Sequence, residues 1–271
     1  MCRSVLDKER IVEALAAEWD ALEKLLTGLD DAQWELSTPL PGWRVRDVAA
    51  HLIGTELMLS GEPTPDAGGD VESLPHVHND IGARNERYVA HFRSQSHEAV
   101  LAKFREVTAA RLASLRAMSD EEFHAPAMTP AGQQTYARFM RIRVFDCWMH
   151  EQDVRDAVGL PGGEQGACAE LSVDEITTAL GFVVGKRGGA PDGSSVTFDL
   201  GSRALHVAVD GRAKVVESLP GEAAVRITLP LGVFTRLCGG RVDPEKALPS
   251  VAFEGDEALG EQLVTHLAFT I

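Results

Sequence analysis

Cysteine, positive charge and long hydrophobic runs are scarce in this sequence, and each shortage argues against a class of protein. The four cysteines are scattered without a CxxC pair, which is typical of reduced cytosolic thiols rather than of a disulfide framework. The 26 Lys and Arg are outnumbered by 41 Asp and Glu, and the net charge of −15 argues against nucleic acid and anionic membranes as partners. No apolar run reaches the length of a membrane span, and the charged first residues lack the apolar core of a signal peptide. We expect a cytoplasmic protein, monomeric or homodimeric.

The first part of the chain has the hydrophobic periodicity of helices. With 271 residues, 44% of them hydrophobic, the chain is long enough for two ordinary domains. The periodicity predicts helices over residues 6–29, 45–60, 79–118, with a break near 94–96, and 134–158. Four long helices indicate a bundle, and bundle cores are places where facing helices build metal sites.

A different pattern follows the Gly-Leu-Pro-Gly-Gly segment at 159–163, which is typical of a helix end and a linker. We predict a helix bundle over 1–160 and a smaller α+β domain with an antiparallel sheet over 161–271. The expected elements are helices over 171–184, 231–238 and 257–269, and strands over 195–200, 204–209, 224–229 and 251–256. Asp210-Gly211 directly after the second of these strands indicates a hairpin turn.

The predicted helix over 134–158 carries the most informative residues. Asp146, His150 and Asp153 are spaced i, i+4 and i+7, and at about 100° per residue they fall on one stripe. Arg143 lies beside them, and most of the remaining helix surface is apolar, so the stripe should be buried. A metal ion would satisfy a buried carboxylate and a buried imidazole together. The alternative is a partly solvated Asp–His helix pair.

A further ligand is offered by His51, on the predicted helix over 45–60. Together with Asp146 and His150 it would supply three protein ligands, which leaves one coordination position open, as in catalytic zinc sites. The alternative for His51 is a core histidine satisfied by hydrogen bonds. Asp47, one turn earlier, is a rival ligand that we rank below His51. The loop residues His76 and His78 form a weaker His-Xaa-His signal.

Two motifs carry a resemblance that covers essentially the whole chain. The segments PGWRVRDVAAHL, around His51, and RVFDCWMHEQDVRDAVG, around His150, resemble the mycothiol-dependent maleylpyruvate isomerase family. The resemblance implies an actinobacterial protein with a DinB-like metal-binding four-helix bundle, followed by a C-terminal domain similar to sterol carrier proteins. By position it places the metal ligands, usually of zinc, on His51, Asp146 and His150. The isomerase has glutamate where this chain has Asp146, which is one methylene shorter.

The resemblance also implies the chemistry. A low-molecular-weight thiol, mycothiol, would bind at the open position as a co-substrate and attack an electrophilic small molecule as the thiolate. A thiol S-transferase is our first hypothesis and a maleylpyruvate-type isomerase the second. A non-catalytic metal- or ligand-binding regulatory protein is the alternative from another class.

Four further residues are expected to contact substrate. The family uses an arginine from its C-terminal domain, for which Arg236 and Arg241 are the candidates here. Arg143 and Asp153 are candidates on the metal-site helix. Asp153 would orient His150 or bond sugar hydroxyls of the thiol, or else form a salt bridge with Arg143 or Arg155.

Overall fold

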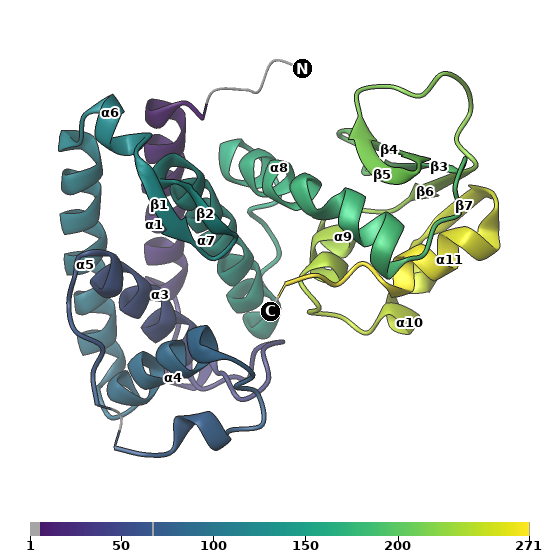
Figure 1. Ribbon diagram of the computed structural model, residues 1–271. Helices are drawn as coiled ribbons and strands as arrows, with labels where there is room; N and C mark the ends of the chain where they lie inside the picture. Colours follow the sequence, from purple (N-terminus) through teal and green to yellow (C-terminus); the bar gives the residue numbers. More distant parts are fainter. Residues whose placement is uncertain (1–5, 67, 271) are drawn as a thin grey trace. The chain divides into compact units, whose positions relative to one another are not determined.

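The computed structural model describes residues 6–66 and 68–270. The chain divides into two compact units, one ending at Gly163 and the other beginning at Glu164 (Figure 1). Among the described residues no helix combines the length and the apolarity that a bilayer crossing requires.

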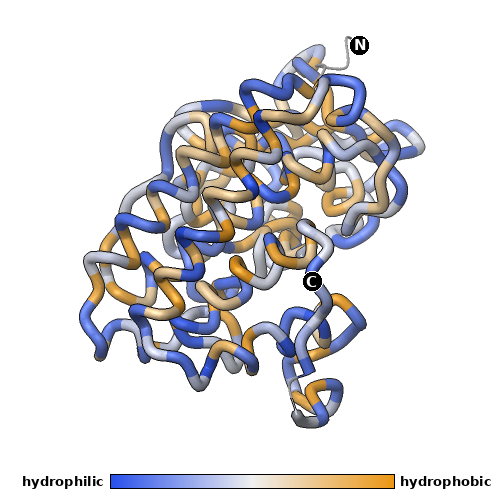
Figure 2. The backbone as a smooth tube through the Cα atoms, turned by 90° about the vertical axis from the view of Figure 1, so that its left-hand side faces the viewer, coloured by the Kyte–Doolittle hydropathy of each residue, from blue (hydrophilic) through white to orange (hydrophobic). Residues whose placement is uncertain are grey.

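Four long helices form the N-terminal unit, as the periodicity predicts. They are α1 (Lys8–Thr27), α3 (Val45–Leu59), α5 (His97–Ala117) and α7 (Tyr136–Val158). Helix α1 packs on α5 and α7, and α3 packs on the same two helices. Hydrophobic residues recur along the helices between hydrophilic ones (Figure 2), and the apolar ones fill the core between them.

The predicted helix over 79–118 is two helices, and the expected break lies between them. Helix α4 (Asp80–Phe92) packs on α3, and α5 starts anew at Ser96, whose side chain accepts a hydrogen bond from the Ala99 amide. Short elements that the periodicity did not indicate join the long helices. They are α2 (Asp31–Trp34), α6 (Asp120–Phe123), the one-turn 3₁₀ helix Val71–Ser73, and the hairpin of β1 (Pro126–Thr129) and β2 (Gly132–Thr135).

Local signals fix the ends of the two helices that carry the candidate ligands. Helix α3 starts where the Asp47 carboxylate accepts the backbone N–H of Arg44 at 2.9 Å. Helix α7 starts at Thr135, whose hydroxyl accepts the Arg138 N–H at 3.2 Å. It ends at Gly159, which has the left-handed backbone conformation (φ 68°) that favours glycine. These ends set the position of each ligand along its helix.

A five-stranded sheet with the order β5-β4-β3-β6-β7 forms the C-terminal unit. Its strands are β3 (Ser195–Asp199), β4 (Ala204–Asp210), β5 (Arg212–Val216), β6 (Val225–Thr228) and β7 (Ala252–Gly255). The predicted hairpin joins β4 and β5 at Gly211, which has a φ of 62°. The expected antiparallel pairing holds for three neighbouring pairs, but β3 and β6 are parallel, because the chain crosses over after β5 to the other side of β3.

Helices cover this sheet. Helix α8 (Ala167–Phe182), which continues as a π-helical turn over Val183–Arg187, packs on β4 and β5. Helix α11 (Glu257–Thr265) packs on β6 and β7. The remaining elements are α9 (Leu231–Cys238), α10 (Pro244–Ala247) and the 3₁₀ turn Leu248–Ser250.

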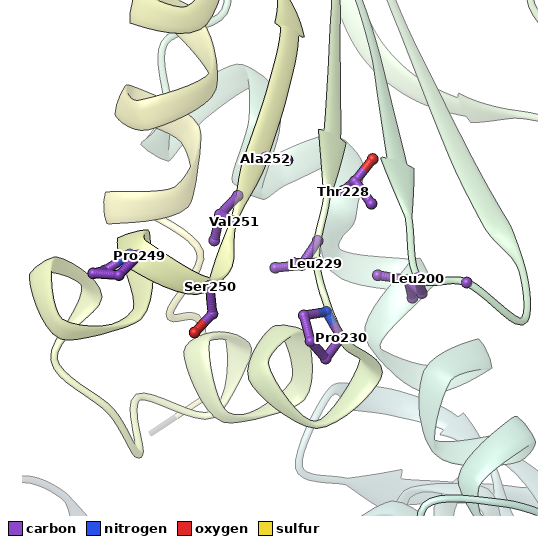
Figure 3. Close-up of a pocket in the computed structure, with 9 residues that line it drawn as sticks. Leu200, Thr228, Leu229, Pro230, Pro249, Ser250, Val251 and Ala252 are labelled. Carbon is purple, nitrogen blue, oxygen red and sulfur yellow. The ribbon is translucent and has the colours of Figure 1, made fainter.

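A hollow of about 470 Å³ lies at the end of the sheet where β3 and β6 stop and β7 begins. Figure 3 shows Leu229 extending from the end of β6 towards Val251. The lining of the hollow is apolar except for the hydroxyls of Thr228 and Ser250 and for backbone groups, and it contains no titratable side chain. The hollow therefore offers shape and apolar surface but no acid, base or metal ligand.

Close contact between α3 and α4 depends on Gly54. A Cβ atom there would lie 2.4 Å from Cγ of Tyr88, whereas one at Gly82, on α4, would come no nearer than 3.7 Å to any neighbour. We expect Gly54→Ala to lower the free energy of unfolding by about 1–3 kcal/mol despite its better helix propensity. Gly82→Ala should be neutral or stabilising. Equal unfolding midpoints in urea for the two variants would contradict this account.

Candidate metal centre

Packing of α3 on α7 brings His51, Asp146 and His150 together. One nitrogen of each imidazole and a carboxylate oxygen lie within 4.8 Å of one another, the one such group of potential ligands found among the described residues. Nε2 of His51 is 3.4 Å from Oδ2 of Asp146, and Nε2 of His150 is 3.5 Å from Oδ1. Two ligands of one tetrahedral zinc ion lie roughly 3.3 Å apart, given bonds of about 2.0–2.1 Å. The group has the spacing of a metal site.

The donor atoms fit a cation because His51 lacks other partners. Its side chain is buried, and neither ring nitrogen has a hydrogen-bond partner among residues 6–66 and 68–270. An unsatisfied buried imidazole is costly, and a cation bound at Nε2 would give that nitrogen a partner. On His150, Nδ1 is 2.9 Å from Oδ2 of the buried Asp153. A hydrogen bond there fixes the tautomer and leaves Nε2 free to bind a metal ion.

Asp146 is held by a buried arginine. Nη1 of Arg143 donates to Oδ2 of Asp146, three residues on along α7. The same guanidinium donates to Oε1 of Glu56 from Nε at 3.1 Å and from Nη2 at 2.6 Å. Oε2 of Glu56 accepts from Nε of Arg111 at 3.0 Å. A chain of alternating charges therefore leads from α5 through α3 to Asp146.

The indole of Trp43 lies against both imidazoles. Its ring centre is 5.2 Å from that of His51 and 6.2 Å from that of His150. Its Nε1 donates to Oε2 of the buried Glu86 at 2.9 Å. Glu86 also pairs with Arg93, whose Nη1 lies 2.9 Å from Oε1. The indole is thus fixed in place and shields the two histidines from water on that side.

Burial and charge give the three candidate ligands different protonation. Burial lowers the pKa of His51, and its contacts with Asp146 offset only part of that effect. Burial would also lower the pKa of His150, but the carboxylates of Asp146 and Asp153 outweigh it and raise that pKa. Burial would raise the pKa of Asp146, yet the charges of Arg143 and His150 hold it well below its usual range. The two carboxylates therefore favour the protonated form of His150, whereas burial favours the neutral form of His51.

Other residues singled out in the sequence lie elsewhere. Asp47 accepts hydrogen bonds from the Arg44 backbone and, at 3.0 Å, from Nε of Arg93, so its oxygens are occupied by protein donors. His76 pairs with Glu86 at 3.1 Å, and His78 is exposed. Neither histidine belongs to the group of potential ligands.

The four residues expected to contact substrate differ in their surroundings. Asp153 pairs with His150, a contact that is compatible with an orienting role, and its contact with substrate stays a prediction. Arg143 is buried, and its contacts with Glu56 and Asp146 favour an anchoring role over contact with substrate. In the C-terminal unit, Arg236 lies on α9 with Nη1 3.3 Å from Oε1 of Glu164, and Arg241 donates to the carbonyl of Gly239 at 2.6 Å. Substrate binding by these two arginines stays a prediction.

Three residues of the site were missed in the sequence. Glu56 and Arg111 are charged residues on the buried sides of otherwise ordinary helices, and Trp43 precedes α3 in the Pro-Gly turn. Glu56 follows His51 by five positions, which is not a spacing that marks a ligand pair. A buried acid between apolar neighbours was the one available signal for it, and its partners lie far away in the sequence.

Comparison with known proteins gives one family for both units. Residues 15–155 match the mycothiol maleylpyruvate isomerase N-terminal domain, and residues 170–262 match the C-terminal domain of the same family. An uncharacterized protein of Mycobacterium tuberculosis, from strains CDC 1551 and H37Rv, is 28% identical over 158 residues, which make up 57% of this chain and 58% of that protein. The chain therefore matches less than two thirds of the length of these relatives.

Solved structures show the same fold. The crystal structure of the mycothiol-dependent maleylpyruvate isomerase has a TM-score of 0.58 and 18% identity, over 92% of this chain and 93% of that one. A histidine-to-alanine mutant of that enzyme gives a TM-score of 0.56 and 16% identity over the same shares. At these identities the likeness establishes the fold and leaves the chemistry to be argued from the site.

The raised pKa of His150 predicts pH-dependent metal binding. Zinc must displace the proton of His150, whereas Asp146 is already ionised because its pKa is lowered. Affinity should therefore fall as the pH drops through the raised pKa of His150, with release of about one proton per zinc. Calorimetry in two buffers of different ionisation enthalpy measures that proton. An affinity that is constant between about pH 8 and pH 5.5 would contradict the assignment of His150 as a ligand.

Proposed function

The chain belongs to the mycothiol maleylpyruvate isomerase family, and from this premise we propose that it is a metal-dependent enzyme that activates a low-molecular-weight thiol. The proposed thiol is mycothiol. Its sulfur attacks an electrophilic small molecule, so that the carbon group of the electrophile is transferred to that sulfur. One observation carries the proposal: two buried imidazoles and a carboxylate, whose ligand atoms lie within 4.8 Å of one another, provide three ligands from two helices. Three ligands leave a position for an exogenous group.

The charges around the site favour an anionic fourth ligand. Asp146, Asp153 and Glu56 carry three negative charges, and Arg143 and Arg111 carry two positive ones within the same chain of contacts. A divalent cation with neutral histidines would bring this set to one net positive charge. A thiolate would neutralise that charge, and a cation held by these residues would supply the positive charge that favours the thiolate over the thiol near pH 7.

Each protein group has a separate task in this reaction. His51, Asp146 and His150 would hold the cation, and Asp153 keeps the Nδ1 proton of His150 in place. Trp43 excludes water from the histidine side of the site. The thiol proton is released, the sulfur forms a bond to the electrophilic carbon, and the leaving group departs with its electron pair. This balance needs no further oxidant or reductant.

Isomerisation is the second candidate, and the observation that favours it is the fold shared with maleylpyruvate isomerase structures. There the thiolate adds to a carbon–carbon double bond, rotation follows about the resulting single bond, and elimination returns the thiol. Arg143 contacts Asp146, the proposed carboxylate ligand of the metal, but its guanidinium is already paired with Glu56. A dianionic substrate would therefore need a clamp from other residues, for which Arg236 and Arg241 are the proposed candidates.

Metal content separates the proposed ligands from the rival histidine. We expect about one equivalent of zinc in the wild type after reconstitution, with loss of most of it in His150→Ala, because two remaining ligands bind weakly. His76→Ala removes a histidine that pairs with Glu86 and lies outside the ligand group, so it should retain the metal. Elemental analysis after dialysis gives both answers. Loss of zinc in His76→Ala with retention in His150→Ala would overturn the site.

Activity assays distinguish the three functional hypotheses. The zinc-loaded protein, given mycothiol and an activated aryl halide, should form the thioether and release halide, and His150→Ala should fall to the uncatalysed rate. Conversion of maleylpyruvate with mycothiol, in the absence of aryl transfer, would favour the isomerase instead. Zinc binding without turnover of either probe would contradict both enzymes and favour a binding protein.

A further inference from the structure

We propose that Arg143 is a positioning residue that restricts Asp146 to ligation through one oxygen, an inference that rests on the metal site proposed above. Arg143 would act on the metal through Asp146 and would touch neither the metal nor the substrate.

The contacts of Asp146 with its neighbours support this role. Oδ2 of Asp146 accepts a hydrogen bond from Nη1 of Arg143 and lies 3.4 Å from Nε2 of His51, while Oδ1 lies 3.5 Å from Nε2 of His150. A guanidinium charge at Oδ2 repels a dication that would approach the same oxygen. Chelation of one cation through both oxygens would therefore compete with the ion pair to Arg143, and Oδ1 would be the favoured ligand atom.

Arg143 is itself fixed too firmly to follow a moving carboxylate. Its side chain is 3% exposed, and two of its nitrogens donate to Oε1 of Glu56 at 3.1 and 2.6 Å. Nη2 also lies 3.4 Å from Sγ of Cys147. Any swing of the guanidinium towards bulk solvent would leave Glu56, which is 2% exposed, with one fewer buried partner. The arginine therefore imposes its position on Asp146.

Arg111 provides a matched control within the same network. Its Nε donates to the other oxygen of Glu56 at 3.0 Å, its Nη2 to the hydroxyl of Tyr136 at 2.7 Å, and its side chain is 6% exposed. Removing either guanidinium takes one buried positive charge from Glu56. Of the two, Arg143 is the one whose contacts include Asp146. A purely structural effect should therefore appear in both variants, and a positioning effect in one.

The experiment compares cobalt- and zinc-loaded wild type, Arg143→Met and Arg111→Met. We expect Arg143→Met to bind zinc roughly 10–100-fold more weakly, as for loss of a partner of a ligand. Its cobalt(II) visible absorption should also weaken, because a released Asp146 chelates through both oxygens and raises the coordination number. Arg111→Met should lose comparable thermal stability while keeping the zinc affinity and the cobalt spectrum of the wild type.

Each other result decides against the inference. An unchanged spectrum and zinc affinity in a folded Arg143→Met variant would overturn the positioning role while leaving the proposed function intact. Equal changes in both variants would show a structural effect only. If Arg143→Met does not fold, Arg143→Lys replaces it. The single ammonium of lysine cannot contact both Glu56 and Asp146, so a smaller loss of zinc affinity and a smaller decrease of the cobalt absorption are expected. The absence of both changes would overturn the proposal. Failure of the wild type to bind either metal would overturn the proposed function, and this inference with it.

Discussion

The buried pairing of Glu56 with Arg143 is the interaction on which the candidate site depends. Glu56 lies on α3 and Arg143 on α7, and these helices also carry His51 and Asp146. A buried ion pair is weak evidence for stability, because desolvation of the two charges offsets most of their attraction. Breaking it by removal of one partner costs about 3–5 kcal/mol, since the other charge stays buried. The pair therefore acts mainly as a constraint on register, since sliding of one helix along the other would separate it.

Sequence periodicity was sufficient for the long helices, the break before His97 and the spacing of the candidate ligands on α7, because these depend on neighbours within one or two turns. His51 was proposed as the further ligand from its residue type and its predicted helix, and the motif resemblance then indicated the same residue by position; nothing local specifies which helix faces which. Glu56, Arg111 and Trp43 escaped prediction because their roles come from contacts with residues distant in the sequence. The parallel pairing of β3 and β6 escaped for the same reason: a strand pattern does not reveal which neighbour the strand joins.

The two units differ in the chemistry that their described residues offer. In the N-terminal unit, carboxylates, imidazoles and guanidinium groups converge in the interior, where Glu56 pairs with Arg111 and Arg143, and His150 pairs with Asp153. In the C-terminal unit, the hollow beside Leu229 and Val251 has no titratable lining. The proposed metal chemistry therefore draws on side chains of the helical unit, whereas this hollow offers shape and apolar surface.

The two histidines differ in how firmly each is held. Nδ1 of His150 is tied to Asp153, whereas neither nitrogen of His51 has a hydrogen-bond partner among the described residues. Rotation of the His51 ring therefore breaks no hydrogen bond, although its packing against Trp43 limits the range. Ions of different radius, or a change in coordination number during turnover, would be accommodated by movement of His51 on α3. Asp146 and His150 on α7 would stay in place. The candidate site would thus combine one compliant ligand, His51, with two that are held by neighbouring side chains.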